Sequence, residues 1–110
     1  MACIFKAADE TSAVVYFLNN LLLEEPELGL EITALTPTDH PAIITLIDER
    51  IESYHPDHAA FYLYECQLEG QHLSYIDGLE LAKRWLSTHG DQGLSLVSEK
   101  AKGLKFVLRT

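Results

Sequence analysis

The spacing of the apolar residues changes several times along this chain, and each spacing favours one kind of element. Between residues 11 and 23 apolar positions recur every third or fourth residue, which is typical of a helix that buries one face. Between residues 28 and 35 they recur at every second residue, which is the period of a strand. A chain that alternates these two spacings is predicted to form an α/β domain.

Two more helices and a hairpin follow. Thr38-Asp39-His40-Pro41 predicts the start of a second helix, because a capping side chain precedes a proline suited to the first turn. Glu69-Gly70 separates residues 61–68 from 72–76 and predicts an antiparallel hairpin. A third helix is predicted to begin at Asp77-Gly78. The expected buried stripes of the three helices are Val14, Phe17, Leu18 and Leu21; Ile43, Ile47, Ile51 and Tyr54; and Leu79, Ala82, Trp85 and Leu86.

The last part of the chain contains two short apolar runs, residues 94–97 and 104–108, on either side of a polar stretch. They predict a terminal β-hairpin over 93–109. The predicted fold is therefore a single α/β domain over residues 1–110, in which the order β-α-β-α-β-β-α over 2–89 is followed by this C-terminal β-hairpin extension. Right-handed crossovers would give a mixed sheet with helices on both faces.

This order resembles the thioredoxin-like fold superfamily, and the segment from Phe61-Tyr62-Leu63-Tyr64 through Glu69-Gly70 to Leu86 is similar to that family's closing hairpin and helix. The resemblance covers residues 2–89 and is one of topology. Ala7-Ala8-Asp9-Glu10 stands where the family places its Cys-x-x-Cys motif, and the proline expected directly before the third strand is absent, since Pro56 lies five residues before Phe61. The resemblance thus implies the scaffold without its redox chemistry.

The charge of the chain is concentrated in its first half. Residues 1–57 carry eleven Asp and Glu residues against only Lys6 and Arg50, whereas residues 58–110 carry six acids and six bases. This acidity suits a solvated surface that keeps a small protein soluble. It also suits a patch that steers the protein onto a cationic partner. The expected partner-binding residues are Tyr16, Leu23, Asp48, Glu49 and Glu52, which combine anchors off the helix stripe with carboxylates on the second helix.

Direct binding to nucleic acid is not expected. Six of the eight basic residues lie between Lys83 and Arg109, where Lys105 and Arg109 share one face of the predicted last strand. A chain with a net charge of −9 would nevertheless be repelled by phosphates at long range. Lysines on an edge strand also discourage aggregation.

Cys3 and Cys66 are far apart in sequence and are expected to be buried, reduced thiols rather than a disulfide framework. His55-Pro56-Asp57-His58 brings two imidazoles and a carboxylate together, but without a second paired motif it predicts a solvated loop. We therefore expect no metal and no cofactor. The first residues do not resemble a signal peptide, and no apolar run is long enough to cross a membrane, so a cytoplasmic location is expected.

These observations predict a small acidic, non-catalytic interaction protein. It would act as a regulator or inhibitor that docks on the basic surface of a larger protein, and a homodimer is compatible with the same features. The larger partner could be an enzyme that handles nucleic acid. In that case the protein would resemble the phage-encoded inhibitors that block host defence enzymes. The alternative is a small cytoplasmic enzyme or ligand-binding domain with a pocket near Asp9, His55 and His58, at the ends of neighbouring strands.

Overall fold

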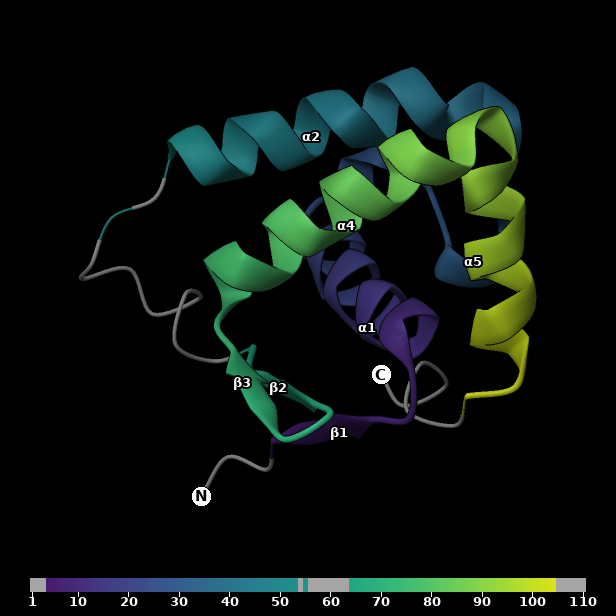
Figure 1. The fold of residues 1–110 in the computed structure, drawn as a ribbon. Helices are drawn as coiled ribbons and strands as arrows, with labels where there is room; N and C mark the ends of the chain where they lie inside the picture. Colours follow the sequence, from purple (N-terminus) through teal and green to yellow (C-terminus); the bar gives the residue numbers. More distant parts are fainter. Residues whose placement is uncertain (1–3, 54, 56–63, 105–110) are drawn as a thin grey trace.

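A computed structural model describes residues 4–53, 55 and 64–104 of the chain. The strand β1 (Phe5–Ala7) leads into the helix α1 (Glu10–Leu23). Three short 3₁₀ turns, Pro26–Leu28, Ile32–Ala34 and Pro37–Asp39, connect α1 to the helix α2 (His40–Glu52). The strands β2 (Cys66–Leu68) and β3 (Gln71–Leu73) then form a hairpin, and the helix α4 (Tyr75–His89), the 3₁₀ turn Gly90–Gln92 and the helix α5 (Gly93–Lys102) follow. Figure 1 shows the small sheet at one end of this helical body.

The sheet is mixed and has three strands in the order β1-β2-β3. β1 pairs parallel to β2, with Phe5 opposite Cys66, and β2 pairs antiparallel to β3, with Cys66 opposite Leu73. Glu69 and Gly70 form the hairpin turn and both have positive φ, at 51° and 81°, as tight hairpin turns require. The predicted hairpin is thus confirmed at this turn. The predicted strand residues 61–63 lie outside the described residues.

The helix α1 is the centre of the core. Its fully buried side chains lie on most of its circumference, as expected of a helix that is surrounded by protein. They are Ala13, Val14, Val15, Phe17, Leu18 and Leu21. The other helices and β2 supply the rest, and the predicted stripe of α4 is buried at all four positions. In α2, Ile43 and Ile47 are buried as predicted and Ile51 is half-buried, whereas Tyr54 lies outside the described residues.

The helix α4 begins at Tyr75, two residues before Asp77, where the sequence predicted its start. Ser74 is the N-cap, and it forms a capping box with Asp77: the Asp77 amide donates to Ser74 Oγ and the Ser74 amide donates to the Asp77 carboxylate. Gly78 therefore lies inside the helix. It permits the close approach of α1, because a Cβ atom at this position would come within 2.3 Å of the Phe17 ring.

The predicted strand over residues 28–35 is wrong. This segment contains two 3₁₀ turns, and Gly29 has a left-handed φ of 66° that ends the first of them. Ile32 and Leu35 are buried, whereas Leu28 is 42% exposed. The buried positions are thus three residues apart, as in a turn of helix, and the alternation in the sequence does not correspond to the two faces of a strand.

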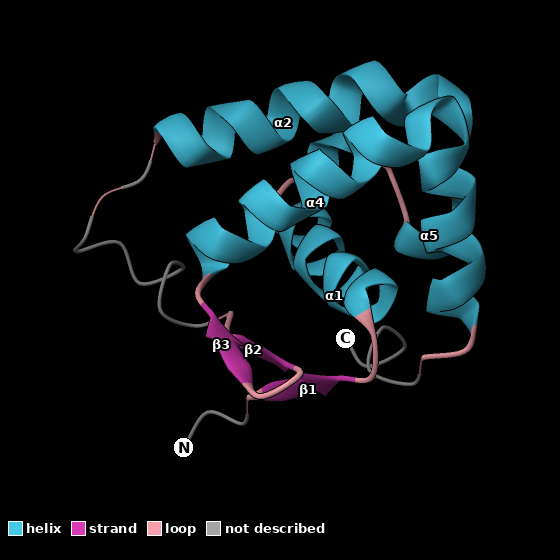
Figure 2. Ribbon diagram, viewed as in Figure 1, coloured by secondary structure: helices cyan, strands magenta, loops and turns pink. Residues whose placement is uncertain are grey.

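The first strand of the predicted terminal hairpin is also wrong, because residues 94–97 lie in α5. Leu94, Val97, Ser98 and Ala101 are buried, at the spacing i, i+3, i+4 and i+7 of one helix face, and Leu96 is 47% exposed. The second predicted strand, residues 104–108, falls almost wholly outside the described residues. Figure 2 shows α1, α2, α4 and α5 on one side of the sheet, so helices on both faces are not confirmed.

Candidate functional site

Three of the six Lys and Arg side chains that the structure describes form ion pairs with another element of the fold. Arg50 of α2 donates from Nη1 to Glu24 Oε1 at 2.7 Å and from Nη2 to Glu25 Oε2 at 2.8 Å, which fastens α2 to the end of α1. Lys83 Nζ of α4 donates to Asp48 Oδ1 of α2 at 2.6 Å. Lys100 Nζ of α5 donates to Asp9 Oδ2 at 2.9 Å. These cations are therefore neutralised by partners in other parts of the fold.

Many carboxylates remain on the surface without a cation beside them. Nine of these are exposed and form no ion pair within the part of the chain that the structure describes; they are Glu10, Glu27, Glu31, Glu49, Glu52, Glu69, Asp77, Glu80 and Asp91. Folding thus preserves the acidity seen in the sequence and presents it to solvent.

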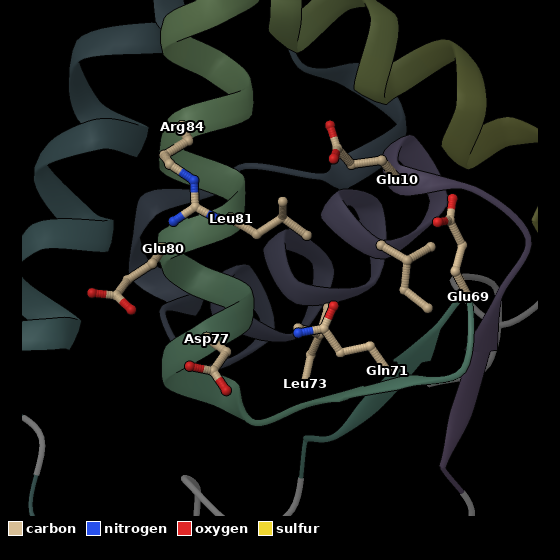
Figure 3. A pocket seen from close by; sticks show the side chains of 9 residues that line it. Glu10, Glu69, Gln71, Leu73, Asp77, Glu80, Leu81 and Arg84 are labelled. Carbon is tan, nitrogen blue, oxygen red and sulfur yellow. The ribbon is translucent and has the colours of Figure 1, made fainter.

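A hollow of about 410 Å³ lies between the hairpin, the start of α1 and α4. Figure 3 shows carboxylates around it from three elements: Glu10 from α1, Glu69 from the hairpin turn and Asp77 from α4. Leu73 and Leu81 form part of its apolar inner surface, and the guanidinium of Arg84 is its one cation. The lining has a strong surplus of negative charge and suits a cationic ligand or surface better than an anionic one.

A second hollow, of about 370 Å³, lies between α2 and α4. It shares Glu80 and Arg84 with the first, so the two adjoin along α4. Its other lining residues are Asp48, Ile51, Glu52 and Lys83. Among the residues that the structure describes, the two hollows together are lined by six carboxylates and two cations, a surplus of four negative charges. We call this surface the α4 face.

The structure separates the predicted partner-binding residues of α2. Asp48 and Glu52 line the α4 face, but Asp48 is held by Lys83. Glu49 lies about 100° further round the helix than Asp48 and lines a different groove, beside Leu28. The three carboxylates are therefore not one patch.

Tyr16 and Leu23 also differ from each other. The ring of Tyr16 stacks on Phe5 with a centroid distance of 4.8 Å and meets Phe17 edge-on at 5.2 Å. Burial raises the pKa of the Tyr16 phenol. Tyr16 thus packs α1 against β1, whereas Leu23 is 54% exposed at the end of α1 and remains available for contact.

The pocket expected near Asp9, His55 and His58 stays a prediction. Asp9 pairs with Lys100 and also caps α1 by accepting a hydrogen bond from the Ser12 amide. These two interactions lower the pKa of the Asp9 carboxyl to about 2. His55 is exposed after the end of α2, and neither residue lines the two hollows above. His58 lies outside the described residues.

Within residues 4–53, 55 and 64–104, no group of three or more His, Cys, Asp or Glu side chains is arranged to hold a metal ion. Cys66 is a reduced thiol in β2, buried as predicted, and burial raises its pKa. Cys3 lies outside the described residues. No described helix has the length and apolarity that crossing a membrane requires.

The sequence interpretation missed Glu10, Glu69 and Glu80 as members of the acidic surface. They are far apart along the chain, and only the packing of α4 against α1 and the hairpin brings them together. No local pattern signals such a group. In comparisons with protein-family models, curated proteins and solved structures, nothing matches this chain.

Proposed function

We propose that this chain is a small non-catalytic interaction protein that binds the cationic surface of a larger protein through its α4 face. Such binding would make it a regulator or inhibitor of that partner. The observation that supports this proposal most is the surplus of four negative charges along two adjoining hollows. The cations that could have neutralised it are used elsewhere: Arg50 holds Glu24 and Glu25, and Lys100 holds Asp9.

Charge of this kind acts chiefly on the rate of association. A field of one sign over a hollowed surface attracts a partner of opposite sign before contact and orients it. Exposed leucines can then limit dissociation, as packed apolar anchors do in protein interfaces. Leu23 is exposed over more than half of its surface and is a candidate for such a contact at the end of α1, outside the lining of the two hollows.

The test is affinity capture from a lysate of the source organism with three matched baits. The first is the native chain, and the second carries Glu52→Lys and Glu80→Lys in the α4 face. The third carries Glu31→Lys and Asp91→Lys, which change the net charge equally outside that face. All four side chains are exposed, so each substitution should change the free energy of unfolding by about 0–1 kcal/mol.

We expect a partner that the native and third baits retain and the second loses. Equal loss from the second and third baits would show that total charge, and not the α4 face, is responsible. Capture that none of the substitutions changes would contradict the proposal.

A further inference from the structure

A groove of about 400 Å³ runs along α2 beside the first 3₁₀ turn, on a different side of the helix from the α4 face. Its walls are apolar and come from Leu28 of that turn and from Pro41, Ala42 and Leu46 of α2. Leu28 is 42% exposed, so part of this wall is open to solvent. The groove therefore offers apolar contact to a side chain from outside the domain.

Carboxylates border this groove. Glu25 and Glu49 both line it, and Glu49 is exposed and has no ion pair among the described residues. Arg50 pairs with both Glu24 and Glu25, and the Glu27 side chain contacts that of Glu25. Of these carboxylates Glu25 lines the groove together with Glu49, and Glu25 shares its guanidinium partner with Glu24.

The carboxylates also crowd one another. Burial and a close contact with the Glu27 side chain raise the pKa of Glu25, although Arg50 acts in the opposite direction. A cationic group placed beside Glu25 and Glu49 would relieve this repulsion. The groove thus combines an apolar cleft with a rim that favours positive charge.

We infer that this α2 groove binds a segment of a partner protein in which an apolar side chain lies next to Lys or Arg. The apolar side chain would occupy the cleft between Leu28 and Leu46, and the basic neighbour would lie against Glu49 and Glu25. The volume falls within the range of sites that hold small ligands, so a short segment fits. This inference rests on the proposed function and extends it to a second contact area with a stated recognition chemistry.

The test is selection of a random twelve-residue peptide library on phage against the native chain, followed by affinity measurement of the enriched peptides as synthetic molecules. Thr45 lines the groove and is exposed, so Thr45→Trp should fill the cleft without disturbing the core. Ala42→Lys, at another exposed lining position, is a second blocking variant in case the first destabilises α2. Glu49→Lys reverses the charge of the rim, and Asp91→Lys, at an exposed carboxylate that lines neither the groove nor the α4 face, is its matched control.

We expect enriched peptides that carry an apolar residue beside Lys or Arg. Their affinity should fall by roughly tenfold or more with Thr45→Trp, Ala42→Lys or Glu49→Lys, and should stay within about twofold of the native value with Asp91→Lys. No enrichment, or binding that the groove variants leave unchanged, would overturn the inference. Sedimentation that shows a dimer of the native chain, broken by Thr45→Trp, would also overturn it and identify a second copy as the occupant.

The outcomes of the two proposals are separable. Peptides that lose affinity with Glu52→Lys or Glu80→Lys but not with Thr45→Trp would support the α4 face and reject the groove. Peptides that lose affinity with Thr45→Trp but not with Glu52→Lys or Glu80→Lys would support the groove and would leave the α4 face without a ligand.

Discussion

At the scale of single residues, Arg50 forms two ion pairs, with Glu24 and Glu25, more than any other side chain that the structure describes. Its side chain is 15% exposed, and its guanidinium binds two carboxylates at once, as the planar fork of arginine allows. Tyr75 Oη donates to Glu24 at 3.4 Å, and burial beside this carboxylate raises the pKa of the phenol far above its usual value. Arg50 therefore compensates the negative charge that folding places near Tyr75.

Arg50→Ala should lower the free energy of unfolding by about 1–3 kcal/mol, because Glu24 and Glu25 would keep their charges and lose their partner. Arg50→Lys should recover only part of this loss, since an ammonium cannot hold both carboxylates in the same geometry. Arg84→Ala is the matched control, because Arg84 forms no ion pair with the described residues. Urea denaturation measures all three, and equal effects of Arg50→Ala and Arg84→Ala would contradict the role of Arg50.

Asp9 makes a contribution to stability that depends on pH. Its carboxyl has a pKa of about 2 in the folded state against 3.8 as the ordinary value, so its stabilising effect is present above about pH 4 and is lost as the pH falls toward 2. Asp9→Asn keeps a capping side chain but removes the ion pair with Lys100. It should cost about 0.5 kcal/mol at pH 7, because the pair is half exposed. The difference should disappear at pH 2 in urea titrations, and a difference that is constant from pH 7 to pH 2 would contradict it.

Cys66 should be inert in the folded protein. Its thiol is fully buried, and burial raises its pKa, so little thiolate is present at pH 7. Labelling of Cys66 by a thiol reagent should be slow in buffer and fast in denaturant, as followed by mass spectrometry of the peptide that contains it. Rapid labelling of the native protein at this residue would show that β2 is accessible.

At the scale of elements, the close contact between α1 and α4 depends on Gly78. In most helices Gly→Ala is stabilising by about 0.5–1 kcal/mol, because alanine restricts the unfolded chain. Here the added Cβ would overlap the Phe17 ring, which is fully buried and has no room to move. Gly78→Ala should therefore destabilise by about 1–3 kcal/mol. Gly103→Ala, where the nearest atom is at 3.7 Å, should be neutral or slightly stabilising, and thermal unfolding of both variants checks the contrast.

The elements also show which parts of the fold the sequence could predict. The stripes of α1 and α4 were predictable because their apolar residues repeat over three or more turns. The segment 28–35 was not, since Leu28, Leu30 and Ile32 alternate over a length at which a strand and a series of turns look alike. The strand predicted at residues 94–97 was wrong for the same reason. A run of four residues is too short to show the helical spacing, which becomes visible only when Ser98 and Ala101 are included. The thioredoxin-like resemblance stays a prediction.

At the scale of the whole molecule, the distribution of cations decides which carboxylates are available to a partner. The sequence predicted the acidity but grouped Asp48, Glu49 and Glu52 by their proximity in the chain. In a helix Glu49 lies about 100° from Asp48 but only about 60° from Glu52, so helical spacing could have distinguished Glu49 from Asp48 and not from Glu52. Two other features depend on tertiary packing and have no signal in the sequence. One is the ion pair between Lys83 and Asp48. The other is the position of Glu10 and Glu69 beside Glu80 around one hollow.

The account's central claim is that the α4 face steers this protein onto a cationic partner. The measurement that tests it most directly is the association rate constant with the captured partner, determined against salt from about 0.02 to 0.3 M, where the screening length shortens from about 20 Å to less than 8 Å. For the native chain the rate should fall by about tenfold or more over this range, and the variant with Glu52→Lys and Glu80→Lys should be slow at every salt concentration. A rate that is independent of salt and unchanged by the two substitutions would contradict the claim.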